Sequence, residues 1–142
     1  MIKWSNMETE DRVNSAINYF KEGYNCAESI LEAMDYEPNI ATAFGAGISR
    51  KGSICGAVTG GILVINLKYG RNSAKEDKEK AYKVALEYID EFEKEFGGIL
   101  CHDLIECDLR TSEGQKKYKD LNLSDERCKK FIGKAIEILQ KI

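Results

Sequence analysis

The sequence predicts an all-α fold, a compact helical bundle of about five or six helices with a buried central helix. The chain has 1 proline in 142 residues, apolar residues recur at three- and four-residue spacing along most of its length, and the period-two alternation of strands is scarce. The length is that of one domain. We therefore expect residues 1–142 to form a single helical domain whose core needs no disulfide bonds.

The first two helices are bounded by recognisable end signals. Residues from about 8 to 22 carry an apolar face, and Gly23 ends this helix because glycine adopts the left-handed conformation at low cost. Asn25 suits the N-cap of the next helix, and Glu28 is placed to complete a capping box with it. We therefore expect a second helix from 26 to about 34.

The central helix follows a glycine-rich loop. A short helix at about 41–44 leads into the loop 45–52, whose glycines indicate irregular backbone. Residues 54–67 are then apolar on nearly every side but too few to span a membrane, so they predict a helix buried within the protein. The loop brings Cys55 to the start of this helix.

In the second half of the chain, the sequence predicts a long amphipathic helix at about 74–96 and a short helix at 99–104. A polar connection at 108–122 follows, and then a last helix capped by Ser124. In the last helix Cys128 shares the spacing of the apolar residues, which predicts that it faces the core. The inward side chains predicted for the long helix are Tyr82, Leu86, Ile89 and Phe96.

Charge and hydropathy exclude several classes of function. Lys and Arg total 21 against 24 for Asp and Glu, a net charge of −3, so we expect no nucleic-acid partner. Residues 1–8 turn acidic where a secretory signal would be apolar, and no stretch is long enough for a membrane span, so we expect a cytoplasmic protein. An apolar central helix in so small a domain favours a covering partner subunit, and we expect a homodimer.

The chemistry indicated by the sequence is that of thiols. The chain has 5 cysteines, an odd number in a chain without a secretory signal, so we expect free, redox-active or metal-bound thiols. Cys26, Cys55 and Cys128 fall near predicted helix starts, where backbone N–H groups and the helix dipole should lower the pKa of a thiol. The alternative is that each is a small buried hydrophobic residue. No two cysteines have the C-x-x-C spacing, so any site is assembled from separate helices.

Three other residues have an open interpretation. His102, the only histidine, is either a ligand or proton carrier, or a satisfied surface group. Arg50 and Lys51 either stabilise a thiolate at Cys55 or keep their loop soluble. The loop 45–52 lacks a preceding strand and the Gly-Lys-Ser/Thr ending of a phosphate-binding loop, so we do not expect nucleotide binding.

The cysteines and glycines also form a recognisable pattern. The matching segments are Gly23-Tyr24-Asn25-Cys26-Ala27, Phe44-Gly45-Ala46-Gly47-Ile48, Cys55-Gly56-Ala57-Val58-Thr59-Gly60-Gly61, Cys101 with Leu104, and Cys128. With its central CGAxxG motif, the chain resembles the C_GCAxxG_C_C putative redox-active protein family. The family's four cysteines map onto Cys26, Cys55, Cys101 and Cys128, so Cys107 is an addition of this chain and is expected to be structural.

The resemblance implies redox activity without naming a substrate or a redox partner. We expect thiol/disulfide chemistry of the thiol oxidoreductase kind at Cys26, Cys55, Cys101 and Cys128. Cys55 is the candidate nucleophile, because Gly56 and Ala57 offer it unobstructed N–H groups. The alternative is that the same four cysteines are metal ligands, for an iron–sulfur cluster or zinc. A third alternative is a helical interaction protein whose cysteines only fill the core; haem is not expected, since C-x-x-C-H is absent.

Overall fold

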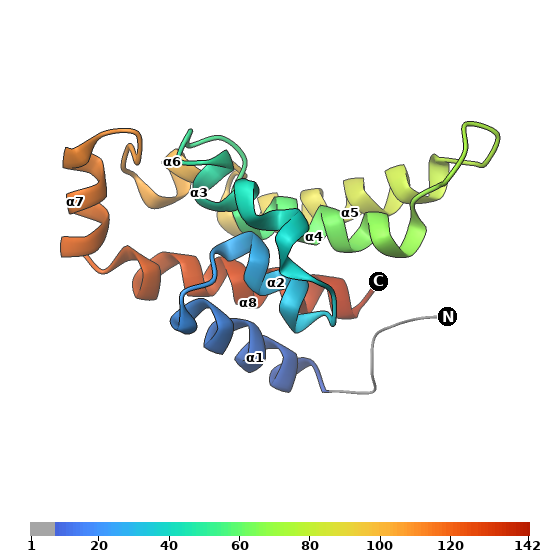
Figure 1. The fold of residues 1–142 in the computed structure, drawn as a ribbon, viewed down its shortest axis with the longest axis horizontal. Coiled ribbons are helices and arrows are strands. Elements are labelled where there is room, and N and C mark those ends of the chain that lie inside the picture. The colour runs from blue at the N-terminus through green and yellow to red at the C-terminus, as the bar shows by residue number, and fades with distance from the viewer. Residues whose placement is uncertain (1–7) are drawn as a thin grey trace.

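The central element of the fold is α4 (Gly56–Tyr69), as the sequence predicts. In the computed structural model, which describes residues 8–142, α4 packs against α2 (Cys26–Ala33), α5 (Glu79–Phe96) and α8 (Lys129–Gln140). The first turns of α4 are buried and its last turn reaches solvent at Leu67. The predicted all-α class and buried central helix are therefore confirmed (Figure 1).

Helix α1 (Thr9–Glu22) covers α8 and α2 and ends where predicted, at Gly23 with φ +115°. Its most buried polar residue is Arg12, whose guanidinium donates to the backbone oxygen of Ala33 at 2.5 Å and to the carboxylate of Asp35 at 3.2 Å. These bonds join α1 to the end of α2. Residues 1–7, on which the cytoplasmic expectation largely depends, lie outside the described part of the chain.

Helix α5 begins at Glu79, several residues later than predicted. The segment before it is held by turn hydrogen bonds instead, including those from Arg71 to the backbone oxygens of Ala74 and Glu76. The inward face differs in part from the prediction: Ile89 and Phe96 pack against the core as predicted, but Tyr82 and Leu86 are 63% and 59% exposed. The buried side chains of α5 are Val84, Tyr88 and Phe92.

The reason for this rotation of α5 is the contact of Tyr88 with α4. The Tyr88 hydroxyl donates to the backbone oxygen of Ala57 at 2.7 Å, and its ring lies against Gly61, where a β-carbon would collide with it. A buried hydroxyl needs a partner, and the Ala57 backbone oxygen of α4 supplies one on this face. The alternative apolar stripe that includes Tyr82 is left in solvent.

The described residues form eight α-helices, not five or six. The sequence pattern predicts neither α3 (Gly45–Ile48) nor α7 (Ser112–Asp120). Helix α6 (Cys101–Ile105) is the short helix expected at 99–104, and the 3₁₀ segment Pro38–Phe44 includes the one expected at 41–44. Helix α7 lies in the predicted polar connection and is capped by Thr111, whose hydroxyl accepts from the Gly114 amide at 2.9 Å. The predicted cap at Ser124 is wrong, because Ser124–Cys128 forms a turn of π-helix that runs directly into α8.

Figure 1 shows α3, α6 and α7 gathered at one end of the bundle, opposite the loop that joins α4 to α5. The amino-terminal end of α4 faces this same region, and the π-turn joins α7 to α8 there. Of the helices described, none combines the length and the hydropathy that a membrane crossing needs.

Candidate functional site

Cys26 is placed by the cap of its own helix. The Asn25 side chain accepts from the Glu28 amide at 2.9 Å, and the Glu28 carboxylate accepts from the Asn25 amide at 3.0 Å, which is the predicted capping box. Thr42 extends the cap, because its hydroxyl donates to Glu28 and its backbone oxygen accepts from Asn25. Four hydrogen bonds therefore fix the backbone at the start of α2, where Cys26 lies.

Cys55 and Cys101 are brought together by a short antiparallel pairing. Ile54 and Leu100 form an isolated β-bridge. On either side of it, the Cys55 amide donates to the Ile99 oxygen at 2.7 Å, and the Cys101 amide donates to the Ser53 oxygen at 2.6 Å. Each cysteine then begins a helix, so the bridge sets two helix starts beside one another.

The glycines of the motif permit close backbone approach around these cysteines. A β-carbon on Gly56 would lie 2.9 Å from the β-carbon of Cys26, and one on Gly60 would lie 2.9 Å from the Ala27 oxygen. Because real β-carbons do not approach so closely, glycine at both positions allows α2 to cross the start of α4 with Cys26 against it. The CGAxxG motif is thus partly a packing motif.

The loop before Cys55 has an unusual backbone. Residues 46–50 all have positive φ, between 52° and 72°. Within this left-handed segment only Gly47 lacks a β-carbon, and one placed there would lie 2.5 Å from the β-carbon of Cys101. The segment therefore passes directly over Cys101, at a conformational cost for each of its non-glycine residues.

Cys128 ends the π-turn and meets two side chains. Its sulfur lies 3.2 Å from the hydroxyl oxygen of Tyr118, which comes from α7. Cys26 is its neighbour in the same cavity and affects its acidity. The fold therefore brings Cys26 and Cys128 near one another, although they are far apart in the sequence.

All four of these cysteines line one cavity of about 280 Å³ at this end of the bundle. Its other walls are largely apolar, and Arg50 is the only charged residue among those that line it. The thiols are deeply placed: Cys55 is 3%, Cys128 5% and Cys101 8% exposed, and Cys26 is partly buried. The fold thus assembles from four separate elements the cysteine set that the sequence analysis selected.

A comparison with known families agrees with this geometry. Residues 24–142 match the family model described as "Putative redox-active protein (C_GCAxxG_C_C)". The chain belongs to the C_GCAxxG_C_C family. The resemblance found in the sequence is therefore confirmed. Searches of curated proteins and of solved structures gave no significant match.

The four thiols that line the cavity of this C_GCAxxG_C_C protein differ in acidity. The pKa of Cys128 is lowered by the neighbouring Cys26 thiol and by the Tyr118 hydroxyl, which together outweigh the opposite effect of burial. The pKa of Cys26 is raised well above its usual value by the neighbouring Cys128 and by burial. The Tyr118 hydroxyl, 3.2 Å from the Cys128 sulfur, therefore favours the thiolate form of Cys128.

The other two thiols are also weak acids, so the lowered pKa predicted at helix starts holds for Cys128 but is wrong for Cys26 and Cys55. Burial raises the pKa of Cys55 to about 12, although hydrogen bonds from the Ala57 and Val58 amides act in the opposite direction. Burial, followed by the nearby Cys128, raises the pKa of Cys101 to about 12. The predicted effect of a helix start is therefore present at Cys55, but the desolvation of the thiolate is larger.

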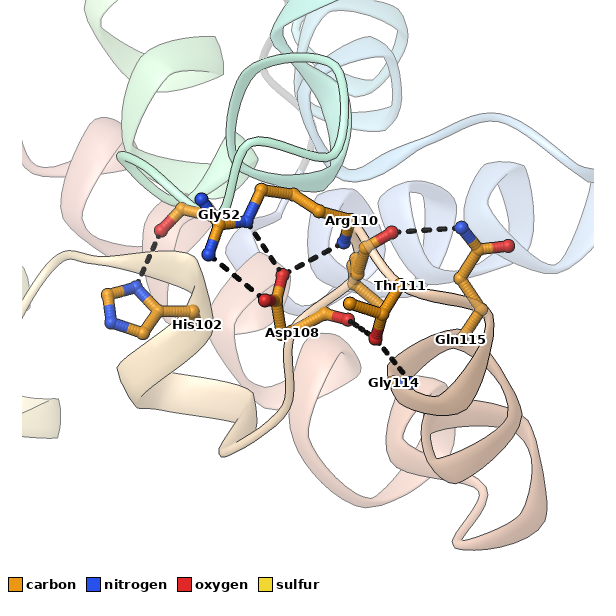
Figure 2. Close-up of polar contacts among 8 residues, drawn as sticks. Gly52, His102, Asp108, Arg110, Thr111, Gly114 and Gln115 are labelled. Atoms are coloured by element: carbon orange, nitrogen blue, oxygen red, sulfur yellow. Dashed lines mark hydrogen bonds and ion pairs between the residues drawn. The ribbon is translucent and has the colours of Figure 1, made fainter.

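Cys107 does not line this cavity. It lies at a second, more polar pocket with His102 and Asp108, where Lys117 and Arg127 are its nearby cations. Figure 2 shows the His102 ring directed at the Gly52 backbone oxygen, 2.9 Å from its Nδ1 atom. The other ring nitrogen lies 3.1 Å from Asp103. His102 is thus a satisfied surface group, the second of the two interpretations offered for it.

The turn that joins α6 to α7 forms one wall of the cavity. Figure 2 shows Asp108 held by Arg110 and the Asp108 backbone oxygen bonded by Thr111. The Gln115 side-chain amide, through Nε2, then donates to the Leu109 backbone oxygen at 2.9 Å. This network fixes the position of α7 and therefore of Tyr118, a site residue that the sequence did not predict. One feature of the sequence could have indicated it, since Tyr118 is the only aromatic residue in the polar stretch 108–122.

The described residues contain no group of three cysteine, histidine or acidic side chains close enough to hold a metal ion. All five cysteines are free thiols. Arg50 lines the cavity, whereas Lys51 lies at the second pocket. The two basic residues that the sequence placed beside Cys55 are therefore separated by the fold.

Proposed function

We propose that this chain is a thiol redox protein whose working pair is Cys128 and Cys26. The single observation that carries the proposal is a cavity lined by four cysteines, in which Cys26 is a neighbour of Cys128 and the Cys128 sulfur lies 3.2 Å from the Tyr118 hydroxyl. Oxidation would join the two sulfurs, with release of two protons and two electrons, and reduction would restore the thiols.

The roles within the pair follow from acidity. A thiolate is the attacking species in thiol chemistry, and Cys128 is the cavity thiol whose pKa is lowered, by the neighbouring Cys26 and by the Tyr118 hydroxyl at 3.2 Å. Cys26, whose pKa is raised, is the resolving cysteine, which attacks the oxidised sulfur of Cys128. This replaces Cys55, which the sequence favoured as nucleophile, because burial holds the pKa of Cys55 at about 12. Cys55 and Cys101 then remain thiols beside the pair.

The test is differential alkylation followed by mass spectrometry. We expect diamide to convert the reduced protein to a form with a Cys26–Cys128 disulfide, and dithiothreitol to restore both thiols. Replacement Cys26→Ser should abolish the disulfide, whereas Cys107→Ser, at a cysteine outside the cavity, should leave it intact. Failure of any reversible disulfide to form among the four cavity cysteines would contradict the proposal.

A second candidate is a metal or iron–sulfur site with Cys26, Cys55, Cys101 and Cys128 as ligands. The observation that favours it is the convergence of all four thiols on one cavity, since thiolates suit soft metals and iron–sulfur clusters. Ligation would require the thiols to draw closer than they lie in the described structure. The test is metal and acid-labile sulfide content after purification without oxygen. Full occupancy in a Cys128→Ser variant would contradict a four-cysteine site.

A further inference from the structure

The depth of the thiols restricts what they could react with. Thiol exchange requires the attacking sulfur to reach its target directly, and three of the four cavity cysteines are at most 8% exposed. A disulfide on another folded protein is attached to backbone on both sides and does not fit a cavity of about 280 Å³. A small molecule does, since an apolar cavity of about 150 Å³ already binds benzene. The geometry therefore favours a small substrate over a protein disulfide.

The walls of the cavity restrict the substrate further. The large apolar residues of the lining are Phe20, Ile105, Leu109 and Phe131, and the Gln115 side-chain amide is used on the Leu109 backbone oxygen. With Arg50 as the only charged residue on the lining, a highly charged molecule such as glutathione disulfide would lose its hydration without compensation. The substrate that fits has an apolar body.

Tyr118 indicates which bond is broken. Its hydroxyl lies 3.2 Å from the Cys128 sulfur and lines the same cavity. Burial and the nearby Cys128 raise the pKa of Tyr118, so the phenol keeps its proton at neutral pH. A disulfide releases a thiolate, which is a stable leaving group and needs no acid. Cleavage of an O–O bond releases a strongly basic alkoxide, for which an adjacent proton donor is an advantage.

We propose that the cavity binds a small, largely apolar organic hydroperoxide and reduces it at Cys128, with Tyr118 as the proton donor; this rests on the redox role proposed for the cysteine pair. The Cys128 thiolate attacks the terminal peroxide oxygen, the O–O bond breaks, and the alkoxide takes the Tyr118 proton and leaves as the alcohol. Cys128 is then a sulfenic acid. The Cys26 thiol gives its proton to the Tyr118 phenolate, and the Cys26 sulfur attacks the sulfur of the sulfenic acid. This attack forms the Cys26–Cys128 disulfide and expels hydroxide, which takes a proton from solvent and becomes water.

The experiment measures the rate of disulfide formation in prereduced protein by quenched alkylation, with four oxidants. These are cumene hydroperoxide, hydrogen peroxide, glutathione disulfide and dithiodipyridine. Because the apolar body is bound by the cavity, cumene hydroperoxide should react roughly tenfold faster than hydrogen peroxide, and glutathione disulfide should be the slowest. Equal rates for the two peroxides, or faster reaction with glutathione disulfide, would overturn the proposal.

A Tyr118→Phe variant tests the proton donor separately from the thiolate. Loss of the hydroxyl lowers the thiolate fraction for every oxidant, but only the two peroxides also lose the proton donor for their leaving group. The ratio of the cumene hydroperoxide rate to the dithiodipyridine rate should therefore fall, by up to roughly 10²-fold, and an unchanged ratio contradicts the role of Tyr118. Tyr82→Phe, at an exposed tyrosine on α5, is the matched control. If diamide forms the Cys26–Cys128 disulfide but hydroperoxides show no preference, this inference fails while the redox role survives.

Discussion

The hydroxyl oxygen of Tyr118 lies 3.2 Å from the sulfur of Cys128, so the one aromatic side chain of α7 meets the cysteine that precedes α8. Together with Cys26 it surrounds the only cavity thiol whose pKa is lowered. The acidity of this thiol is therefore produced by neighbouring side chains. Cys55 occupies a better position at a helix start and is nonetheless a weaker acid.

The first prediction concerns the pH dependence of Cys128 alkylation. The Tyr118→Phe variant loses a hydrogen bond that favours the thiolate, so the midpoint of the pH–rate profile with iodoacetamide should move upward. A hydrogen bond of roughly 1 kcal/mol corresponds to a little under one pH unit. The midpoint is measured by mass spectrometry of the labelled peptide, and Tyr82→Phe should leave it in place. A midpoint that does not move would show that Tyr118 does not stabilise the thiolate.

The second prediction is a loss of stability in alkaline solution. The pKa values of Cys55 and Cys101 rise on folding from 9.0 to about 12, so within that window the unfolded chain releases protons that the folded chain retains. Stability should then fall as pH rises from 9.0 towards 12, because the unfolded state binds fewer protons. Urea unfolding across this range should show a smaller slope in the Cys55→Ser, Cys101→Ser double variant. An identical slope would contradict the burial of the two thiols.

The third prediction concerns the motif glycine at 56. In a Gly56→Ala variant the new β-carbon would lie 2.9 Å from the β-carbon of Cys26, so α2 and α4 must move apart. We expect a loss of about 1–3 kcal/mol in the free energy of unfolding, measured by urea denaturation, with slower formation of the Cys26–Cys128 disulfide. Gly98→Ala is the matched control, since a β-carbon there meets nothing within 4 Å. Equal effects of the two substitutions would refute the close approach.

The fourth prediction concerns the buried arginine of α1. Arg12→Met keeps most of the apolar volume of the side chain but removes the N–H groups that donate to the Ala33 backbone oxygen and the Asp35 carboxylate. We expect the free energy of unfolding to fall by about 1–3 kcal/mol, since the Ala33 oxygen is left without this charged partner. Arg110→Met, at an exposed pair with Asp108, should cost less than about 1 kcal/mol. Similar losses in both variants would mean that burial adds nothing to the Arg12 contacts.

Local end signals made much of the fold predictable. Gly23 and the Asn25–Glu28 capping box act on neighbouring residues, and the structure confirms both. The face of α5 was not predictable in this way. Two apolar stripes were available there, and the choice depends on Tyr88 reaching a backbone oxygen 31 residues away.

The four cavity cysteines were selected from the sequence pattern alone, but their roles were not. Acidity depends on the balance between hydrogen bonds and desolvation. Whether Cys55 is buried, and whether Cys128 meets Tyr118, is decided by contacts between distant segments. Helix α7 was also missed, because its sequence is polar and the only local sign of a helix is the N-cap at Thr111.

The left-handed segment 46–50 has a consequence for how the cavity opens. Four of its five residues carry a side chain that makes this conformation unfavourable, by roughly 1–2 kcal/mol each, and Ala46, Gly47 and Arg50 belong to the cavity wall. Local unfolding of this stretch releases that strain, so it requires less free energy than local unfolding of the packed helices around it. The amide hydrogens of 46–50 should exchange with solvent faster than those of the rest of the wall. The cavity would then admit its substrate through brief fluctuations of one short loop, with every helix remaining in place.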